Sequence, residues 1–306
     1  MDDASHGSHD GTAPAEVPAE APAESAAEAE TQARTEAAAE TPADRADGEH
    51  TAGVRVHAEE LGLDGPHGEV FSGIGFDAPP GSLVALEGPS GSGRTCLLLA
   101  LTGRMKATAG RATVDGLRLP KQLAAVRRLS ALAAVPGVTD LEPALSVAEH
   151  IRERALLQRR FDASLRSLLR PRAERAAASR ARTSAALEAA GLDVEALPKG
   201  SRTRVRDLER LEALRLSVAL ALIGAPRLLA VDDVDFKLSE AERDQVWSLL
   251  RSLASSGVTV LAVCSEAPGD AVRVRTGASP RPVRQQTAKA TTGKETADAL
   301  AEAGHA

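Results

Sequence analysis

The chain has 306 residues, of which 43% are hydrophobic and 26% are charged, with a formal net charge of −6. No stretch approaches the roughly 20 apolar residues that a membrane-spanning helix requires, so we expect no segment to cross a bilayer. The two cysteines, Cys96 and Cys264, exclude a disulfide framework and a cysteine-rich metal cluster, and we interpret both as small core residues.

Residues 1–51 differ in composition from the rest of the chain. They carry 13 acidic residues against Arg34 and Arg45, a net charge of −11, which leaves about +5 for the remainder. Val17 is their only branched apolar residue, so they bury too little surface to offset the entropy of ordering. We expect a disordered, acidic, Ala- and Pro-rich arm whose simplest role is to aid solubility. It shows no basic segment followed by an apolar run, so we expect a cytosolic chain.

From residue 53 the apolar pattern predicts short strands and helices in a regular order. Alternating apolar residues predict strands near 54–58 and 70–76, and the run 83–86 predicts a buried strand. The elements that we expect next are a helix at 95–101, a strand at 112–114, a turn at Asp115-Gly116, a helix near 122–128 and a strand at 131–135.

The second half is expected to begin with helices. Residues 147–190 are predicted to be helical with one break at Pro171, and 204–223 to form one long helix. The elements expected after these are strands at 228–231, 258–263 and 271–275, with a helix at 240–253. Apolar strands that alternate with helices predict an α/β fold with a sheet covered on both faces. Residues 277–306 are polar and are expected to form a disordered tail.

A glycine-rich segment after the strand at 83–86 carries the strongest chemical signal. Gly88-Pro89-Ser90-Gly91-Ser92-Gly93-Arg94-Thr95 fits the phosphate-loop pattern Gly-x-x-x-x-Gly-Lys-[Ser/Thr], except that Arg94 replaces the lysine. Glycines let the backbone approach an anion, and the following helix directs its positive end at it. We predict that this loop binds the phosphates of a nucleotide, and that the Thr95 hydroxyl contacts Mg²⁺. A glycine turn without a ligand is the alternative.

The order of landmarks over residues 53–276 resembles the nucleotide-binding subunit of an ABC transporter. The segments that carry the resemblance, besides the phosphate loop as Walker A, are Val135-Pro136-Gly137 in the place of Val-Pro-Gln, Leu145 to His150 in the place of Leu-Thr-Val-x-Glu-Asn, Leu208 to Glu212 in the place of Leu-Ser-Gly-Gly-Gln, and Leu228 to Asp233 as Walker B. The resemblance implies a P-loop NTPase fold of the ABC-ATPase type, with a mixed sheet, an antiparallel β subdomain and a helical insertion at about 141–206. It also implies that Gly88 to Cys96 bind ATP and that Asp232 holds Mg²⁺ through water.

Several catalytic positions depart from the family pattern. Asp233 stands where the family has its catalytic glutamate and is one methylene shorter, which affects the placing of the attacking water. The other departures are the missing glutamine side chain at Gly137, the missing serine and glycines in 208–212, the serine at 265 in place of the switch histidine, the missing aspartate in 236–239, and the missing adenine-stacking aromatic in 57–68. They predict weak or absent hydrolysis.

Two functions remain open at this stage. The resemblance implies a Mg-ATP-binding subunit that pairs with a separately encoded transmembrane subunit, as a homodimer or a heterodimer with another cassette. The alternative is a pseudo-ATPase that acts as a scaffold or regulator of a membrane protein. In both cases the expected location is cytoplasmic, at the inner face of the cell membrane through the partner. A P-loop kinase is disfavoured by the helical insertion.

Arginine is concentrated in one segment of the helical insertion. Between residues 152 and 182 there are 10 arginines against three acidic residues, Glu153, Asp162 and Glu174. A solvated basic face is the simplest explanation, followed by docking to a membrane subunit near anionic headgroups. Phe161 is the only aromatic residue in the segment, so no base-stacking platform is evident and no specific nucleic acid is expected as a partner.

Overall fold

The computed structural model describes residues 53–161 and 171–277. The chain divides into two units, Met1–Glu49 and His50–Ala306, and every described residue belongs to the second. The arm predicted at 1–51 and, apart from Gly277, the tail predicted at 277–306 lie outside the described residues. None of the helices in the described ranges is long and apolar enough to cross a bilayer.

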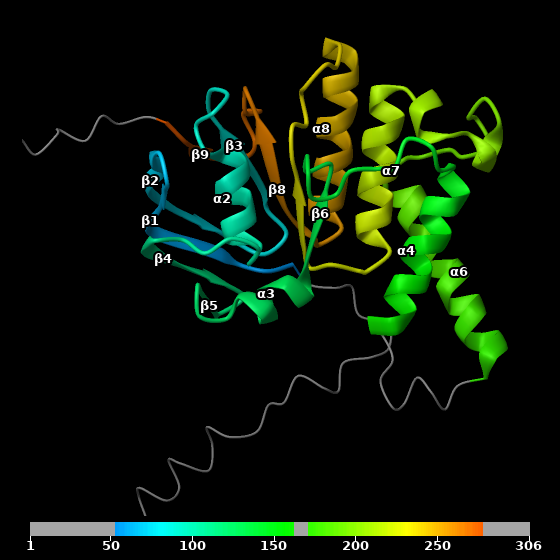
Figure 1. Ribbon diagram of the computed structural model, residues 1–306, viewed down its shortest axis with the longest axis horizontal. Helices are drawn as coiled ribbons and strands as arrows, with labels where there is room; N and C mark the ends of the chain where they lie inside the picture. The colour runs from blue at the N-terminus through cyan, green and yellow to red at the C-terminus, as the bar shows by residue number, and fades with distance from the viewer. Residues whose placement is uncertain (1–52, 162–170, 278–306) are drawn as a thin grey trace, which may run out of the picture. The chain divides into compact units, whose positions relative to one another are not determined.

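The strands form one antiparallel and one parallel sheet (Figure 1). The antiparallel sheet has the order β2-β1-β4-β5, with β1 at Val56–Gly65, β2 at Gly68–Ala78, β4 at Ala109–Val114 and β5 at Leu117–Leu119. The parallel sheet has the order β6-β7-β8-β3-β9, with β3 at Leu83–Glu87, β6 at Ser130–Ala133, β7 at Leu228–Val231, β8 at Thr259–Cys264 and β9 at Val272–Arg275. The predicted α/β class with an antiparallel subdomain is therefore confirmed.

Both faces of the parallel sheet are covered, as the continuous apolar strands predicted. On one face Val84 and Leu86 join the core that includes the antiparallel sheet and α2 (Arg94–Leu101). On the other face Ala85 and its neighbours pack against α7 (Arg210–Leu222) and α8 (Glu240–Ser255). Because the strands are short and parallel, their carboxyl ends meet at one edge, where the loops after β3, β7 and β8 come together.

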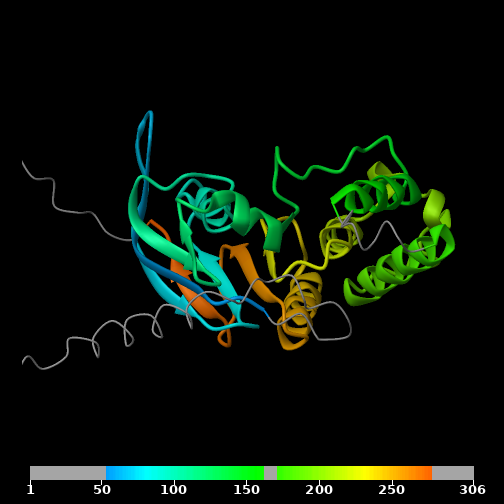
Figure 2. The ribbon, with the colours of Figure 1, turned by 90° about the horizontal axis from the view of Figure 1, so that it is seen from below.

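The remaining helices lie between the strands in the sequence. They are α3 at Leu123–Leu129, α4 at Val147–Phe161 and α6 at Arg172–Ala189, with short 3₁₀ turns η1 at Gly200–Arg202 and η2 at Val205–Asp207. Helices α4 and α6 contact each other and α7, which forms the predicted helical insertion. Figure 2 shows the pair side by side, in green. Pro171 directly precedes α6, as predicted, and residues 162–170 lie outside the described residues.

The predicted single helix at 204–223 is wrong at its start. Residues Val205–Asp207 form a 3₁₀ turn, and α7 begins only at Arg210. The carboxylate of Glu212 accepts the backbone N–H of Glu209 at 2.9 Å, as part of a capping box. This bond satisfies a donor that has no partner within the helix, and it fixes the helix start at this point.

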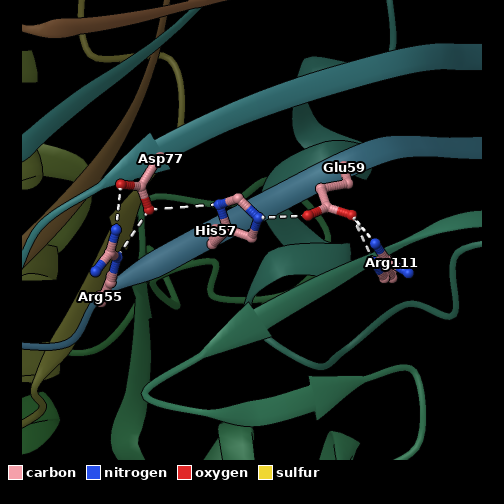
Figure 3. Close-up of polar contacts among 5 residues, drawn as sticks. All are labelled: Arg55, His57, Glu59, Asp77 and Arg111. Carbon is pink, nitrogen blue, oxygen red and sulfur yellow. Dashed lines mark hydrogen bonds and ion pairs between the residues drawn. The ribbon is translucent and has the colours of Figure 1, made fainter.

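A row of charged residues lies across strands β1, β2 and β4 (Figure 3). Arg55 donates to Asp77 at 2.6 and 2.8 Å, and His57 lies 2.9 Å from Glu59 and 3.4 Å from Asp77. Arg111 pairs with the other oxygen of Glu59. The pKa of Glu59 is lowered by His57 and then Arg111, and that of Asp77 mainly by Arg55. These exposed pairs connect three strands and support their register.

Candidate nucleotide-binding site

The phosphate loop joins β3 to α2 in a conformation that only its glycines adopt without strain. Gly91 and Gly93 both have φ of +81°, and Gly93 is the N-cap of α2. The Ser92 N–H donates to the Pro89 carbonyl at 3.2 Å, which closes a tight turn. The first N–H groups of α2 have no acceptor within the helix, so this turn leads into an anion-binding helix end.

Thr95 and Asp232, the two residues expected to hold Mg²⁺, lie next to each other beside this loop. The Thr95 hydroxyl donates to Asp232 Oδ2 at 2.7 Å, and the Asp233 N–H donates to Asp232 Oδ1 at 2.9 Å. Asp232 follows β7 and is only 1% exposed. Burial raises the pKa of its carboxyl group; the charge of Asp233 also raises it, whereas the hydrogen bond from Thr95 lowers it.

The donor chemistry of this pair fits Mg²⁺. A buried carboxylate is costly without a cation, and Mg²⁺ prefers oxygen ligands, usually one or two carboxylates together with waters and phosphate oxygens. In the described ranges no group of three or more His, Cys, Asp or Glu side chains could hold a metal ion. A Mg²⁺ ion at Thr95 and Asp232 would therefore need further oxygen ligands from a nucleotide and from water.

Arg94, the one departure from the phosphate-loop pattern, contacts the backbone of β8. Its guanidinium donates to the Cys264 carbonyl at 2.6 Å, at the end of β8. The Cys264 side chain is fully buried, which raises the pKa of its thiol to about 12. Cys96, a residue of α2, is half-buried against the core, and burial also raises the pKa of its thiol. The prediction that both cysteines are small core residues agrees with these positions.

The loop after Walker B and the end of β8 are linked by a residue that the sequence analysis missed. Asp235 accepts the Ser265 backbone N–H at 2.7 Å and also the Ser265 hydroxyl. Ser265 is the residue in the place of the switch histidine, and it is engaged by this carboxylate. Asp233 is half-buried with φ of +46°. The carboxyl ends of β7 and β8 therefore bring Asp232, Asp233 and Ser265 to the same edge as the phosphate loop.

The segment Leu208 to Glu212, in the place of Leu-Ser-Gly-Gly-Gln, makes contacts at the start of α7 and with Phe236. Glu209 and Glu212 form the cap of α7. The Arg210 guanidinium lies 6.0 Å from the centre of the exposed Phe236 ring and 3.4 Å from its carbonyl oxygen. Among the hydrogen bonds of the described residues, none joins this segment to the phosphate loop.

Gly137, in the place of the family glutamine, is exposed, and its N–H donates to Asp140 at 2.8 Å.

A cavity of about 1080 Å³ lies between the α/β core and the helical insertion. Its walls come from α3, β6, α4, α7 and the loop at 138–141, and they include four arginines, Arg104, Arg127, Arg128 and Arg154. Arg104 donates to the Ser130 hydroxyl at 2.8 Å and to two backbone carbonyls. Burial lowers its pKa to about 10, with a further contribution from the charges of Arg127 and Arg154. Of these four, only Arg154 belongs to the arginine-rich segment 152–182 noted in the sequence.

Comparison with known proteins identifies the family. The model of the ABC transporter family matches residues 71–235, more than half of the chain. The chain belongs to this family. The match begins in β2 and ends after the Walker B segment, so it includes the phosphate loop and the helical insertion.

Similar sequences include the Nod factor export ATP-binding protein I of three bacteria. The one from Rhizobium etli is 30% identical over 192 residues, which are 63% of this chain and 54% of the relative. The one from Cupriavidus pinatubonensis is 33% identical over 192 residues (63% and 53%), and the one from Ralstonia nicotianae is 31% identical over 202 residues (65% and 56%). The chain thus spans about half the length of the curated relatives that it matches.

Solved structures support the fold. The ATP-binding cassette MJ0796, in a post-hydrolysis dimer bound to ADP and Pi, is 21% identical with a TM-score of 0.54, and the match covers 69% of this chain and 88% of that one. The cbiO1 protein of Clostridium perfringens, part of an ABC transporter complex, is 20% identical with a TM-score of 0.55, covering 69% and 78%. At these identities the similarity establishes the ABC cassette fold.

Proposed function

We propose that this chain is the ATP-binding subunit of an ABC-type membrane transporter, and that it binds Mg-ATP with weak or absent hydrolysis. The observation that carries the proposal is the meeting of Thr95 and the buried Asp232 at the end of the phosphate loop, 2.7 Å apart. A buried carboxylate beside an anion-binding helix end provides for both parts of a magnesium nucleotide, the metal and the phosphates.

Each part of the loop has a separate task in this proposal. The residues that would contact the nucleotide are Gly88, Pro89, Ser90, Gly91, Ser92, Gly93, Arg94, Thr95 and Cys96. The backbone N–H groups of the loop bind phosphate oxygens, and Arg94 adds positive charge from beside the Cys264 carbonyl. Thr95 would hold Mg²⁺ directly, and Asp232 would hold it through water. When bound, Mg²⁺ neutralises negative charge on the terminal phosphates.

Hydrolysis is expected to be slow because the groups that would act on water are short or already engaged. Asp233 has a shorter side chain than the family glutamate and is held at φ +46°. Ser265 is bound to Asp235 and offers no imidazole. The carboxylates of Glu209 and Glu212 cap α7, and their negative charge repels a phosphate from that helix end. A partner cassette in a heterodimer would have to supply an intact catalytic glutamate or an intact Leu-Ser-Gly-Gly-Gln segment.

The cavity beside the helical insertion is the proposed docking site for the membrane subunit. Val138 and Leu157, which line it, are 53% and 41% exposed and are among the most exposed large apolar residues of the described ranges. A helix of about 10 Å diameter occupies roughly 420 Å³ per turn, so the cavity has room for about two turns. Within the described ranges the four cavity arginines form no ion pair, and the lining contains only two acidic residues, Asp140 and Glu153. The occupant that this charge favours is an amphipathic helix carrying carboxylates.

The direction of transport and the location follow from the same proposal. The relatives are named as export proteins, and we infer export for this chain too, from their 30–33% identity. Docking would place the chain at the inner face of the membrane. A pseudo-ATPase that binds nucleotide only to stabilise a scaffold is the alternative, favoured by the same changes at Asp233, Ser265 and α7.

Titration of the full chain tests the proposal. A fluorescent ATP analogue with Mg²⁺ is added to the wild type, to Arg94→Ala and to Arg118→Ala, a control at an exposed position on β5, and phosphate release is followed in the same samples. Saturable binding that weakens in Arg94→Ala but not in Arg118→Ala, with no phosphate above the blank, is the expected result. Absence of binding at millimolar nucleotide would contradict the binding function. Steady phosphate release would contradict the loss of hydrolysis.

A further inference from the structure

The C-terminal end of β9 lies directly against the phosphate loop. Thr276 follows β9, and its N–H donates to the Glu87 carbonyl at 2.9 Å, at the last residue of β3. The Thr276 hydroxyl lies 2.6 Å from the Ser92 hydroxyl and 3.4 Å from the same carbonyl. Thr276 is only 2% exposed. The side chain therefore sits beneath the loop, out of contact with solvent.

The packing around this contact leaves no room for additional atoms. A Cβ at Gly88 would lie 2.5 Å from the Thr276 hydroxyl and 2.7 Å from the Ser92 hydroxyl. A Cβ at Gly277 would lie 2.9 Å from the Ser92 Cβ. All three distances are below those that real Cβ atoms show, so the residues on either side of the hydroxyl pair are held in close contact.

The strand that carries Thr276 is itself fastened to the strand that enters the loop. Glu87 and Arg275 are paired in register between β3 and β9, and the Glu87 carboxylate lies 3.6 Å from Arg275 Nε and 3.2 Å from Arg273 Nε. A displacement of β9 would therefore pull on the entrance of the loop and on Ser92 together.

We propose that Thr276 is a positioning residue for nucleotide binding, which holds Ser92 and so keeps the backbone N–H groups of the phosphate loop in their phosphate-binding arrangement. The inference rests on the proposed function, because it concerns the same site. When the Ser92 hydroxyl donates to the Thr276 hydroxyl, and the Thr276 hydroxyl donates to the Glu87 carbonyl, both hydroxyl groups have an acceptor. Loss of the Thr276 hydroxyl leaves Ser92 without this partner and lets the turn that it closes with Pro89 move.

The test measures the affinity of the full chain for Mg-ATP and Mg-ADP, with competition by inorganic pyrophosphate. Thr276→Val keeps the shape and removes the hydroxyl, Thr276→Ser keeps the hydroxyl, and Ser92→Ala removes the other partner. A single hydrogen bond contributes about 0.5–1.5 kcal/mol. Thr276→Val should therefore lower the affinity for each of the three ligands by about 2- to 10-fold. Thr276→Ser should bind nearly as wild type, and the double variant Thr276→Val with Ser92→Ala should bind no more weakly than either single variant.

A second buried threonine separates positioning from stability. Thr259 is fully buried at the start of β8, where its hydroxyl contacts Val54 and Gly81 at the opposite end of the strand from the loop. Thr259→Val should lower the melting temperature and leave nucleotide affinity unchanged. The proposal is overturned if Thr276→Val lowers the melting temperature but binds nucleotide as wild type, or if the effects of the two substitutions at 92 and 276 simply add. Absence of nucleotide binding by the wild type would overturn the proposed function, and the positioning role with it.

Discussion

Two glycines of the phosphate loop provide a direct measure of how tightly the loop is packed. Gly91 and Gly93 share the same φ of +81°, but a methyl group at position 91 would meet nothing within 4 Å. A methyl group at position 93 would lie 2.6 Å from the Val70 carbonyl oxygen and 2.9 Å from Val70 Cγ1. Alanine at either position therefore has the same unfavourable backbone conformation, and only alanine at position 93 also makes a steric contact with β2.

The magnitudes follow from these two terms. A left-handed conformation costs a non-glycine residue about 1–2 kcal/mol, which is the whole expected loss of unfolding free energy for Gly91→Ala. Gly93→Ala adds an overpacking cost of about 1–3 kcal/mol, because the contacting atom is backbone and β2 must shift. The sum is about 2–5 kcal/mol.

Urea denaturation and thermal melting of the full chain measure the difference. At about 2–4 °C per kcal/mol for a domain of this size, Gly93→Ala should melt about 2–12 °C lower than Gly91→Ala. Gly93→Ala should also bind Mg-ATP more weakly than Gly91→Ala, because the displaced residue is the N-cap of α2. Equal stabilities for the two variants would refute the contact between the loop and β2 on which the reasoning depends.

Three further outcomes are expected. Thr95→Val should weaken ATP binding in the presence of Mg²⁺ by at least about 10-fold and change binding without Mg²⁺ little, because the hydroxyl contacts the metal. Equal losses of affinity with and without Mg²⁺, measured by titration, would contradict this. Because burial raises the pKa of Asp232, the nucleotide-free protein should lose stability as pH rises from the ordinary Asp range through that raised pKa, and Asp232→Asn should lack this loss in melting curves compared across pH. Arg128→Glu should weaken binding of a Leu- and Glu-bearing amphipathic helical peptide by about 2- to 5-fold and improve binding of its Lys counterpart, whereas Arg118→Glu should change neither; anisotropy that shows no preference between the peptides would contradict an acidic occupant of the cavity.

The parts of the site that sequence could predict are those encoded locally. Gly88 to Thr95 contains both the turn and the start of the helix, so the conformation follows from neighbouring residues. The buried strands β3, β6, β7 and β8 were predicted because each one is a short apolar run. The start of α7 was predicted too early, although Glu212, three residues after Glu209, is a capping signal present in the sequence.

Contacts between distant segments were beyond sequence reasoning. Asp235 meets Ser265 across 30 residues, and Thr276 meets Ser92 across 184 residues. Nothing in the local pattern of a threonine after a short strand indicates that it reaches the phosphate loop, because the neighbour is set by the order β8-β3-β9 in the sheet. The cavity was missed for the same reason, since Arg104, Arg127 and Arg154, which line it, come from three separate segments.

The residues of the site differ in whether folding alone explains their presence. Gly88, Gly93 and Ser92 have structural tasks, since they let the loop pack against Val70 and Thr276. A phosphate loop kept for packing would look the same without any nucleotide. Asp232 is different, because its burial disfavours the charged form and raises its pKa, so the carboxylate costs stability in the nucleotide-free protein. A cation at this position offsets that cost, which is why Asp232, more than the glycine pattern, supports the binding of a magnesium nucleotide.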